Sequence, residues 1–469
     1  MSVETETRPS TSITGRSLAV LLVMCGAIFL EGIDVGMFNV ALPSIRADLP
    51  METGELQWII SAYILGYGGF VLLGGRAADL FGRRRVFLIA LTVFLAFTGL
   101  GALATDPWML IVARAATGVA AAFMAPAGLS IITTTFTGAT RDRAVLIYSG
   151  VGAGGFSVGL VAGGLLTMFG WRWVFIAPLV IAAALLAIAV PFIPRAANAL
   201  AALSRGRLDV LGGLTVTTAL VVLVAGIEGA PHRPLLTTVV TFAIGALLLL
   251  AFVVVERRAA QPLVRFGIFR HANLVRANLG AALLAGGFLG FQFVVALYLQ
   301  EELGWSVLET SLALLVSGID VIIAPLFTPR LVARFGTRRV ILGGLVLAAL
   351  AYALFLPVAP DWTYAMMFPS FLAIGLAFAF AYGPLTIAAT EDVEDDEQGL
   401  AGGLLYTGFQ FGGAIGLAVV SGLLVALEST EAEGVEAYRG ALFGPLVFAI
   451  AAVAIAAGGV LRRRAVSRV

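Results

Sequence analysis

The sequence predicts an all-α integral membrane protein: two six-helix bundles plus two inserted helices, giving fourteen transmembrane helices. Three observations predict this class. The 469 residues are 60% hydrophobic and only 12% charged, with a mean hydropathy of +1.01, which is outside the range of soluble domains. Fourteen apolar runs reach the length of about 20 residues that a membrane-spanning helix needs. An arginine-rich hexapeptide also occurs twice, 254 residues apart.

The apolar runs give the order of the predicted helices. They cover approximately residues 17–44, 56–75, 86–105, 108–128, 144–168, 173–193, 209–228, 236–255, 276–299, 309–328, 339–357, 363–389, 400–427 and 441–461. Only a short stretch around Gly170 separates the fifth run from the sixth, so thirteen and fifteen spans stay open as alternatives. The first run is longer than the apolar core of a signal peptide, and we interpret it as a retained helix.

The placement of arginine predicts the orientation. All 29 basic residues are arginine; with a cytoplasmic N-terminus, 24 of them fall in cytoplasmic loops and tails, four in outer loops and one, Arg114, inside a span. Basic loops stay cytoplasmic, so we expect a multi-pass protein of the plasma membrane with both termini in the cytoplasm. The loop 390–399 is acidic although cytoplasmic by this count, which the rule tolerates because acids contribute little.

The repeated hexapeptide predicts an internal duplication. FGRRRV at 81–86 returns as FGTRRV at 335–340, and each copy would join the second and third helices of a six-helix unit. Transporters are commonly built from such repeats, with a binding site between them. Independent convergence of two arginine-rich loops is the alternative, but it does not account for the shared Phe-Gly. The expected parts are a tail at 1–16, a bundle at 17–193, inserted helices at 209–255, a bundle at 276–461 and a tail at 462–469.

Composition also argues against several classes of function. The chain has no lysine, hence no Walker-type phosphate loop, and its net charge of +1 gives no reason to expect a nucleic-acid partner. Cys25, His232 and His271 are the only cysteine and histidines, so we expect no metal site, no cofactor and no enzyme. A non-transporting scaffold or sensor would need a soluble module, and the longest polar segments, 194–208 and 256–275, are too short for one.

Four charged residues lie well within predicted spans rather than at their ends: Glu31, Asp34, Arg114 and Asp320. Each costs about 2.5–3.5 kcal/mol at a helix centre, which suggests function. Glu31 and Asp34 lie three residues apart on one helix face, and two such close carboxylates cannot both be ionised cheaply in a low dielectric. We therefore expect proton coupling at Glu31, Asp34 and Arg114. A purely structural Asp34–Arg114 pair is the alternative, and for Asp320 a functional and a packing role stay equally open.

Small and aromatic residues suggest further sites. Gly155, Gly159 and Gly163 recur every four residues, followed by Gly164, a pattern that lets two helices approach closely. Aromatic and polar residues of the later spans could line an apolar cavity with a few polar anchors, although they could equally face lipid. The candidates for substrate binding are Phe291, Gln292, Tyr298, Asp320 and Tyr382.

Together the motifs resemble the 14-helix drug:proton antiporters of the major facilitator superfamily, over essentially the whole chain. DVGMFNVALP at 34–43 is similar to the family's first-helix motif, LIVARAATG to its fourth-helix motif, and the run at 150–164 to its fifth-helix antiporter motif. The signature loop between helices 2 and 3 is matched by GRAADLFGRRR, through Gly75, Asp79, Gly82, Arg83 and Arg84.

The resemblance implies roles for these residues. Asp34 would recognise a proton or cation, Arg114 would take part in proton transfer, and Asn39 would lie near the substrate. Asp79 with Arg83 and Arg84 would form a conformational latch, with the acid facing a helix N-terminus of the other half. Ala333 stands opposite Asp79 in the second copy, so the latch would be one-sided. The implied function is monomeric, proton-coupled export of amphipathic small molecules, such as drugs and antibiotics, by alternating access.

Some positions depart from the family pattern. Leu160 stands where the fifth-helix motif usually has proline, Thr117 where the fourth-helix motif often has glutamine, and Val35 and Gly36 where hydroxyl residues usually follow the first acid. The loss of a helix-bending proline keeps open a facilitator or symporter that imports a small solute.

Overall fold

The computed structural model describes residues 15–194, 208–231, 233–259, 261–394, 397–428 and 434–466. Throughout these ranges the regular structure is helical, and 14 helical stretches are long and apolar enough to cross a membrane. The predicted fold class and number of spans are therefore confirmed. His232, most of the tail 1–16, and Arg195, Arg205 and Arg207 lie outside the described residues.

The first bundle has six helices. They are α1 (Arg16–Asp48), α2 (Thr53–Phe81), α3 (Arg83–Ala102), α4 (Pro107–Thr135), α5 (Gly138–Thr167) and α6 (Trp173–Phe192). Their ends carry ordinary stop and start signals. The Asp106 carboxylate accepts the backbone N–H of Met109 at 3.0 Å and caps α4, whose first residue is Pro107. Gly82 ends α2 at φ +91°, a conformation that favours glycine.

The inserted pair and the second bundle follow. They comprise α7 (Val210–Gly229), α8 (Leu235–Arg258), η1 (Phe266–Arg270), α9 (Ala272–Leu297), η2 (Tyr298–Glu302), α10 (Val307–Leu315), η3 (Val316–Ile319), α11 (Asp320–Phe335), α12 (Thr337–Phe355), α13 (Tyr364–Thr390), α14 (Gln398–Glu428), α15 (Val435–Ala441) and α16 (Phe443–Val466). The predicted span 309–328 is thus two α-helices joined by the 3₁₀ turn η3, immediately before Asp320. Helix boundaries extend beyond the apolar runs because polar residues continue the first and last turns outside the expected membrane core.

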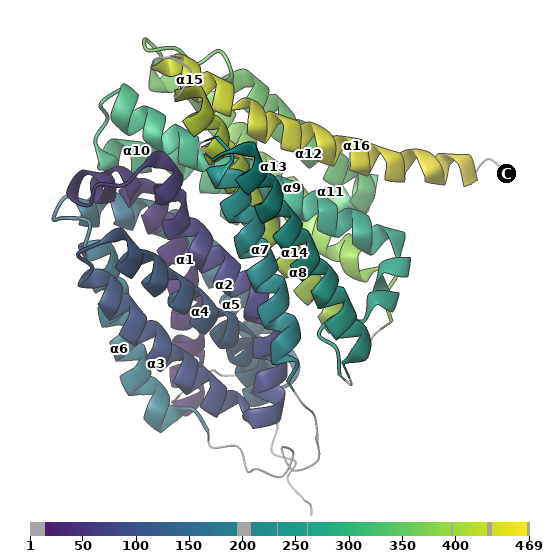
Figure 1. Cartoon of the computed structure of the whole chain (residues 1–469). Coiled ribbons are helices and arrows are strands. Elements are labelled where there is room, and N and C mark those ends of the chain that lie inside the picture. Colours follow the sequence, from purple (N-terminus) through teal and green to yellow (C-terminus); the bar gives the residue numbers. More distant parts are fainter. Residues whose placement is uncertain are drawn as a thin grey trace, which may run out of the picture.

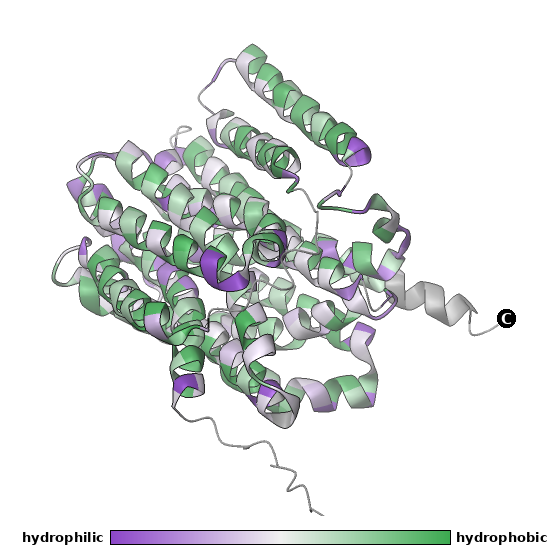
Figure 2. Cartoon of the chain, turned by 90° about the horizontal axis from the view of Figure 1, so that it is seen from below, coloured by the Kyte–Doolittle hydropathy of each residue, from purple (hydrophilic) through white to green (hydrophobic). Residues whose placement is uncertain are grey.

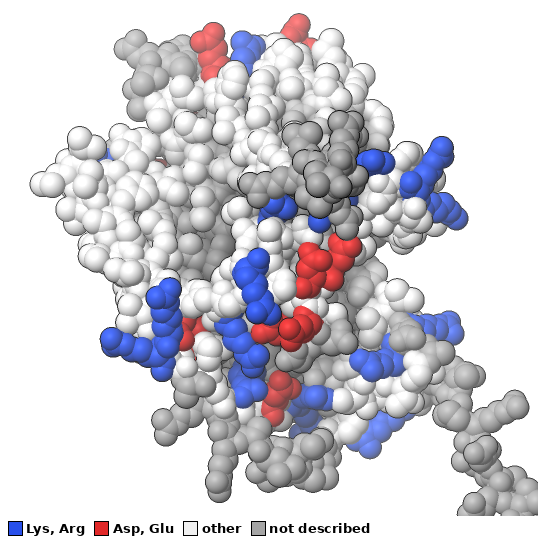
Figure 3. Space-filling model, turned by 90° about the vertical axis from the view of Figure 1, so that its right-hand side faces the viewer, with Lys and Arg blue, Asp and Glu red and all other residues white. Residues whose placement is uncertain are grey.

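The two bundles meet at one end and diverge toward the other. In Figure 1 the N-terminal bundle runs to the lower left and α16 runs to the right, both away from the region of α10 and α15. We call the end that carries the loops after α2, α4, α6, α8, α11 and α13 the arginine-rich end, and the other the opposite end. On the face in Figure 3, basic and acidic side chains intermingle beside a broad uncharged surface.

The acidic loop after α13 explains part of this mixed surface. Glu394 pairs with Arg270 and Glu397 pairs with Arg265, each at 3.6 Å between nitrogen and oxygen. The acidic residues of the loop 390–399 therefore balance the charge of the arginines that precede α9.

The inserted helices lie outside the two bundles. The first of the pair, α7, packs closely on α2, because a methyl group at Gly69 would lie only 1.9 Å from the Thr217 hydroxyl oxygen. It also contacts α14, because a methyl group at Gly422 would lie 3.3 Å from the Ile227 carbonyl oxygen. The second, α8, is almost wholly exposed and apolar, as expected for a lipid-facing helix (Figure 2). Helix α7 thus bridges the two bundles on one side.

Candidate functional site

A central cavity of about 500 Å³ lies between the two bundles. This volume is in the range of small-molecule sites. Two carboxylates, Glu31 and Asp320, line it from opposite bundles. Nine aromatic side chains also line it: Tyr63, Tyr67, Tyr148 and Phe156 from the first bundle, and Phe288, Phe378, Tyr382, Tyr406 and Phe409 from the second.

At the opposite end, side chains tie the two bundles together. Arg46 of α1 pairs with Glu301 at 3.2 Å, and Glu301 also accepts the Tyr438 hydroxyl at 3.4 Å. The Gln300 amide donates to the Val40 carbonyl at 3.0 Å. These contacts hold the two bundles together at this end.

The predicted pair of Asp34 and Arg114 is present and deeply buried. The Arg114 guanidinium donates to Asp34 Oδ2 at 2.5 Å and to the Ile59 carbonyl at 2.9 Å, and both residues are 2% exposed. The guanidinium also lies 4.0 Å from the ring centre of Phe38 and 4.5 Å from that of Tyr63. Two hydrogen bonds, one of them to the Asp34 carboxylate, and two aromatic rings together offset the cost of burying the charge. Neither Asp34 nor Arg114 lines the central cavity.

Glu31 is the acid of α1 that faces the cavity. It is 6% exposed, and its Oε2 atom accepts the Tyr67 hydroxyl at 2.9 Å. Its Oε1 atom accepts no hydrogen bond from the described residues, an arrangement that is costly for a buried carboxylate. The Tyr67 ring lies 5.2 Å from the ring of Tyr406 on α14, so the partner of Glu31 touches the second bundle. Glu31 therefore offers one unfilled acceptor to whatever occupies the cavity.

Of the six residues predicted to bind substrate, Asp320 and Tyr382 line the cavity. The other four do not. Phe291 packs inside the second bundle, with its ring 5.1 Å from Phe355 and 5.3 Å from Tyr352. Phe288, three residues earlier on α9, lines the cavity instead. The two side chains are only about 60° apart around the helix, so the edge of the cavity wall falls between them.

The remaining three predicted substrate residues have partners elsewhere. Gln292 sits one layer behind the cavity wall, with its amide 3.4 Å from the Ser317 hydroxyl. Tyr298 lies toward the opposite end and donates to the Ala359 carbonyl at 2.8 Å. Asn39 donates to the Val35 carbonyl of its own helix at 3.3 Å. Each is buried by packing within its bundle, which a sequence pattern alone does not distinguish from facing a cavity.

Three glycines of α5 lie directly against α1. A methyl group at Gly159 would lie 2.4 Å from the Ile33 carbonyl oxygen, and one at Gly163 would lie 2.8 Å from Met37 Cα. Gly155 likewise faces Gly32 at 3.0 Å. Helices α1 and α5 therefore touch backbone to backbone beside Glu31 and Asp34. Gly164 contacts a different helix. A methyl group at Gly164 would lie 2.3 Å from the Ser311 hydroxyl oxygen of α10, so glycine leaves room for that side chain.

The predicted latch lies at the arginine-rich end of α2. Asp79 and Arg83 approach to 4.0 Å, and both side chains are more than a third exposed. Asp79 and Gly75 line a second cavity of about 750 Å³, whose far wall includes Gly399 at the start of α14. Among the residues that the structure describes, Asp79 forms no hydrogen bond or ion pair with a helix N-terminus of the other bundle in this conformation. The bundles diverge at this end, and the cavity separates Asp79 from the start of α14.

The other latch residues are positioned by local structure. Arg83 donates to the Ser130 carbonyl of α4 at 3.5 Å, whereas Arg84 turns toward α6 and donates to the Val190 carbonyl at 2.7 Å. A methyl group at Gly75 would make ordinary contact with Pro126 at 3.7 Å, so packing does not require glycine there.

Comparison with known proteins agrees with this architecture. The profile of the Major Facilitator Superfamily matches residues 24–417. The chain belongs to the Major Facilitator Superfamily. Among solved structures of similar fold, a nucleoside transporter superposes with a TM-score of 0.67 at 16% identity, covering 93% of this chain and 99% of that one.

Two superfamily relatives share more of the sequence. The puromycin resistance protein of Streptomyces alboniger is 37% identical over 416 residues, covering 86% of this chain and 80% of that protein. The cephamycin export protein of Amycolatopsis lactamdurans is 35% identical over 457 residues, covering 94% and 92%. Both likenesses extend over nearly all the helices.

Sequence reasoning missed Tyr67 and Tyr406, which link Glu31 to the second bundle. One signal for Tyr67 was available: Tyr63 and Tyr67 are four residues apart on α2, on the face that the structure turns to the cavity. Nothing comparable marks Tyr406. Within the described residues, no three His, Cys, Asp or Glu side chains form a group that could hold a metal ion.

Proposed function

We propose that this member of the superfamily exports amphipathic small molecules across the plasma membrane by alternating access, with protons as the coupling ion. Glu31 carries the proposal. It is a buried carboxylate with one unfilled acceptor, it faces the central cavity, and it lies one helical turn from the Asp34–Arg114 pair. A proton and a cationic substrate would compete for the negatively charged region formed by Glu31 and Asp34.

The proposed orientation places the arginine-rich end in the cytoplasm, as the bias in arginine placement favours. The present conformation would then receive substrate from the cytoplasmic side, because the Arg46–Glu301 contacts hold the bundles together at the other end. Export requires those contacts to break. The divergent arginine-rich ends must also approach, bringing Asp79 toward the start of α14.

The charges of α1 suggest how a proton drives the cycle. With Asp34 ionised, its charge balances Arg114, and Glu31 is available to a cation in the cavity. Protonation of Asp34 would leave Arg114 without its ionised partner, and Glu31, three residues away on the same helix, is the carboxylate that would take its place. Arg114 would then displace a bound cation from Glu31. One proton taken up from outside thus releases one substrate charge.

The lining of the cavity indicates the class of substrate. Aromatic rings from both bundles favour flat, apolar groups, and carboxylates on two walls favour a positive charge. The names of the two relatives, a puromycin resistance protein and a cephamycin export protein, support antibiotics within that class. We propose that the chain acts as a monomer embedded in the bilayer and needs no cofactor beyond the proton.

Transport in inside-out membrane vesicles tests this function. With the vesicle lumen made acidic, we expect accumulation of puromycin and of ethidium, and loss of accumulation when a protonophore collapses the gradient. Asp34→Asn should abolish uptake. Asp106→Asn is the matched control, since it makes the same chemical change at an exposed helix cap where asparagine also caps well.

Accumulation that survives the protonophore, or full activity of Asp34→Asn, would refute proton-coupled export. Accumulation only when the gradient is reversed would instead establish an importing symporter, the alternative that Leu160 keeps open.

A further inference from the structure

The two copies of the repeated loop use their matching arginines differently. In the first copy, Arg84 donates to the carbonyls of Val190 at 2.7 Å and Ile193 at 3.0 Å, where α6 ends. Arg16 donates to the Phe192 carbonyl of the same terminus at 2.9 Å. The last carbonyls of a helix lack partners within the helix, so they readily accept hydrogen bonds from arginine. In the first copy these arginine side chains occupy the space between the helices.

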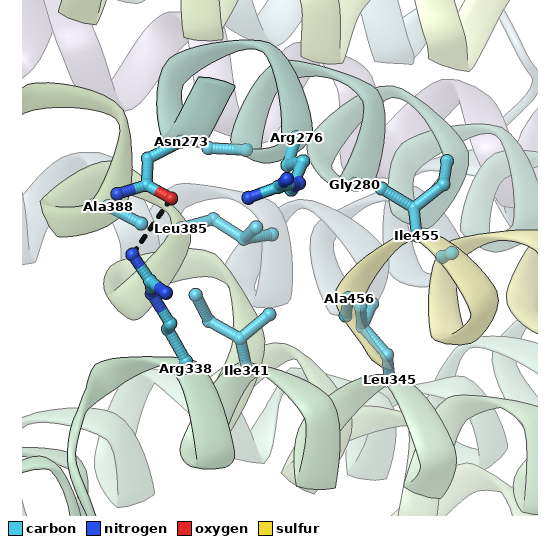
Figure 4. Close-up of a pocket in the computed structure, with 12 residues that line it drawn as sticks. Asn273, Arg276, Gly280, Arg338, Ile341, Leu345, Leu385, Ala388, Ile455 and Ala456 are labelled. Atoms are coloured by element: carbon cyan, nitrogen blue, oxygen red, sulfur yellow. Dashed lines mark hydrogen bonds between the residues drawn. The ribbon is translucent and has the colours of Figure 1, made fainter. Parts of the chain in front are cut away.

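The second copy has no helix end at this place. Arg338 stands 254 residues after Arg84. Helix α16 continues to Val466, so the carbonyls before its last turn accept hydrogen bonds within the helix and are not free for an arginine. Arg338 instead donates to the Asn273 side chain of α9 at 3.0 Å. A groove is left open between α9, α12, α13 and α16 (Figure 4).

The groove has a basic mouth and apolar walls. Figure 4 shows the Arg276 and Arg338 side chains directed into the same space, with Asn273 beside them. Deeper in, the walls are aliphatic and include Ile341 and Ile455. The groove encloses about 40 Å³, room for about three or four water molecules, so it is too narrow for the solutes that fit the central cavity.

The groove also favours an anion. No acidic side chain of the described residues forms an ion pair with Arg276. Asp392 accepts a hydrogen bond from the Asn273 amide and leaves Arg276 without an ion-pair partner among the described residues. Helix α9 begins here at Ala272, and no side chain caps it, so its first backbone N–H groups add positive potential.

We propose that this groove binds an anionic phospholipid from the leaflet at the arginine-rich end. The phosphate would lie between Arg276, Arg338 and the start of α9, and the first methylenes of an acyl chain would lie against the aliphatic walls. Basic pockets between membrane helices on the cytoplasmic side are suited to such headgroups. The leaflet follows from the proposed orientation, whereas the site itself depends on neither substrate nor protons.

Lipid binding to the purified full-length protein tests the site. The protein is placed in phosphatidylcholine nanodiscs with increasing phosphatidylglycerol, and retained lipid is measured by native mass spectrometry. Loss of one arginine near anionic lipid should lower the affinity about fivefold. The double variant Arg276→Gln with Arg338→Gln should therefore bind phosphatidylglycerol roughly 25-fold more weakly. The control, Arg334→Gln with Arg339→Gln, removes the same charge from two exposed side chains nearby and should bind like the wild type.

A second variant separates the headgroup from the chain. Ala456→Phe fills the apolar part of the groove without changing any charge, and it should also weaken binding. Equal loss in the control pair would overturn the site, because the effect would then be general charge. Unchanged binding in Ala456→Phe, or displacement of the lipid by millimolar inorganic phosphate, would overturn the assignment to a phospholipid. None of these readouts requires transport.

Discussion

The two halves of the central cavity are built alike but charged differently. The first bundle contributes Glu31 and, behind it, the Asp34–Arg114 pair, whereas the second contributes one acid, Asp320, among aromatic rings. Under the shift of 254 residues, the position of Asp34 is taken by Phe288, which lines the cavity. Duplication therefore accounts for the helices and their packing, and a few substitutions confine the buried ion pair to one half.

The difference suggests a division of labour. Helix α1 carries both of its acids where glycines let α5 approach backbone to backbone, so the charges are held on a rigid contact. Asp320 lies just after a 3₁₀ turn between two helices, a less regular position. We expect the first half to couple protons and the second to shape recognition of the substrate.

Arg114 should give the largest effect. Arg114→Leu leaves Asp34 buried without its partner, and we expect loss of transport and a free energy of unfolding lowered by about 3–5 kcal/mol. The double variant with Asp34→Asn should recover most of the stability but no transport. Thermal denaturation and vesicle uptake measure the two effects. A single variant as stable as the wild type would show that the pair is not the anchor of the first half.

Glu31 should come next. Glu31→Gln keeps an acceptor for Tyr67 but removes the charge in the cavity, so folding should be unaffected and efflux of cationic probes at least about 30-fold lower. Tyr67→Phe, which removes only the hydroxyl, is expected to lose less. Uptake of a neutral probe serves as the comparison. Equal losses for cationic and neutral probes would mean that Glu31 does not contact the substrate.

The smallest effect is expected in the repeated loops. Asp79→Asn should slow turnover about two- to fivefold, since a helix N-terminus favours an ionised acid only modestly, while substrate affinity stays the same. Ala333→Asp, which places an acid at the matching position of the second copy, should change little. Steady-state uptake at several substrate concentrations separates rate from affinity. A changed affinity with an unchanged rate in Asp79→Asn would contradict the latch.

Much of this comparison could be predicted from the sequence. The spans, the duplication and the four charges within spans are visible because charge is rare in apolar runs, and the Asp34–Arg114 pair could be anticipated as an alternative. The faces of the helices could not. In a membrane bundle, lipid-facing and core-facing sides are both apolar, so periodicity did not separate Phe288 in the cavity from Phe291 in the core.

Contacts between the halves were also beyond the sequence. The Arg46–Glu301 pair and the Tyr67–Tyr406 contact join residues that are hundreds of positions apart, and each depends on how far the bundles diverge. The break before Asp320 was missed because a 3₁₀ turn needs no change in hydropathy.

The central claim is that substrate and proton compete at the acids of the first half. Its most direct test is proton release from the purified protein when puromycin binds, followed with a pH-sensitive dye in weakly buffered solution. We predict release from the wild type and from Asp320→Asn, and none from Glu31→Gln with Asp34→Asn. Release that persists in the Glu31 and Asp34 double variant but disappears in Asp320→Asn would contradict the account.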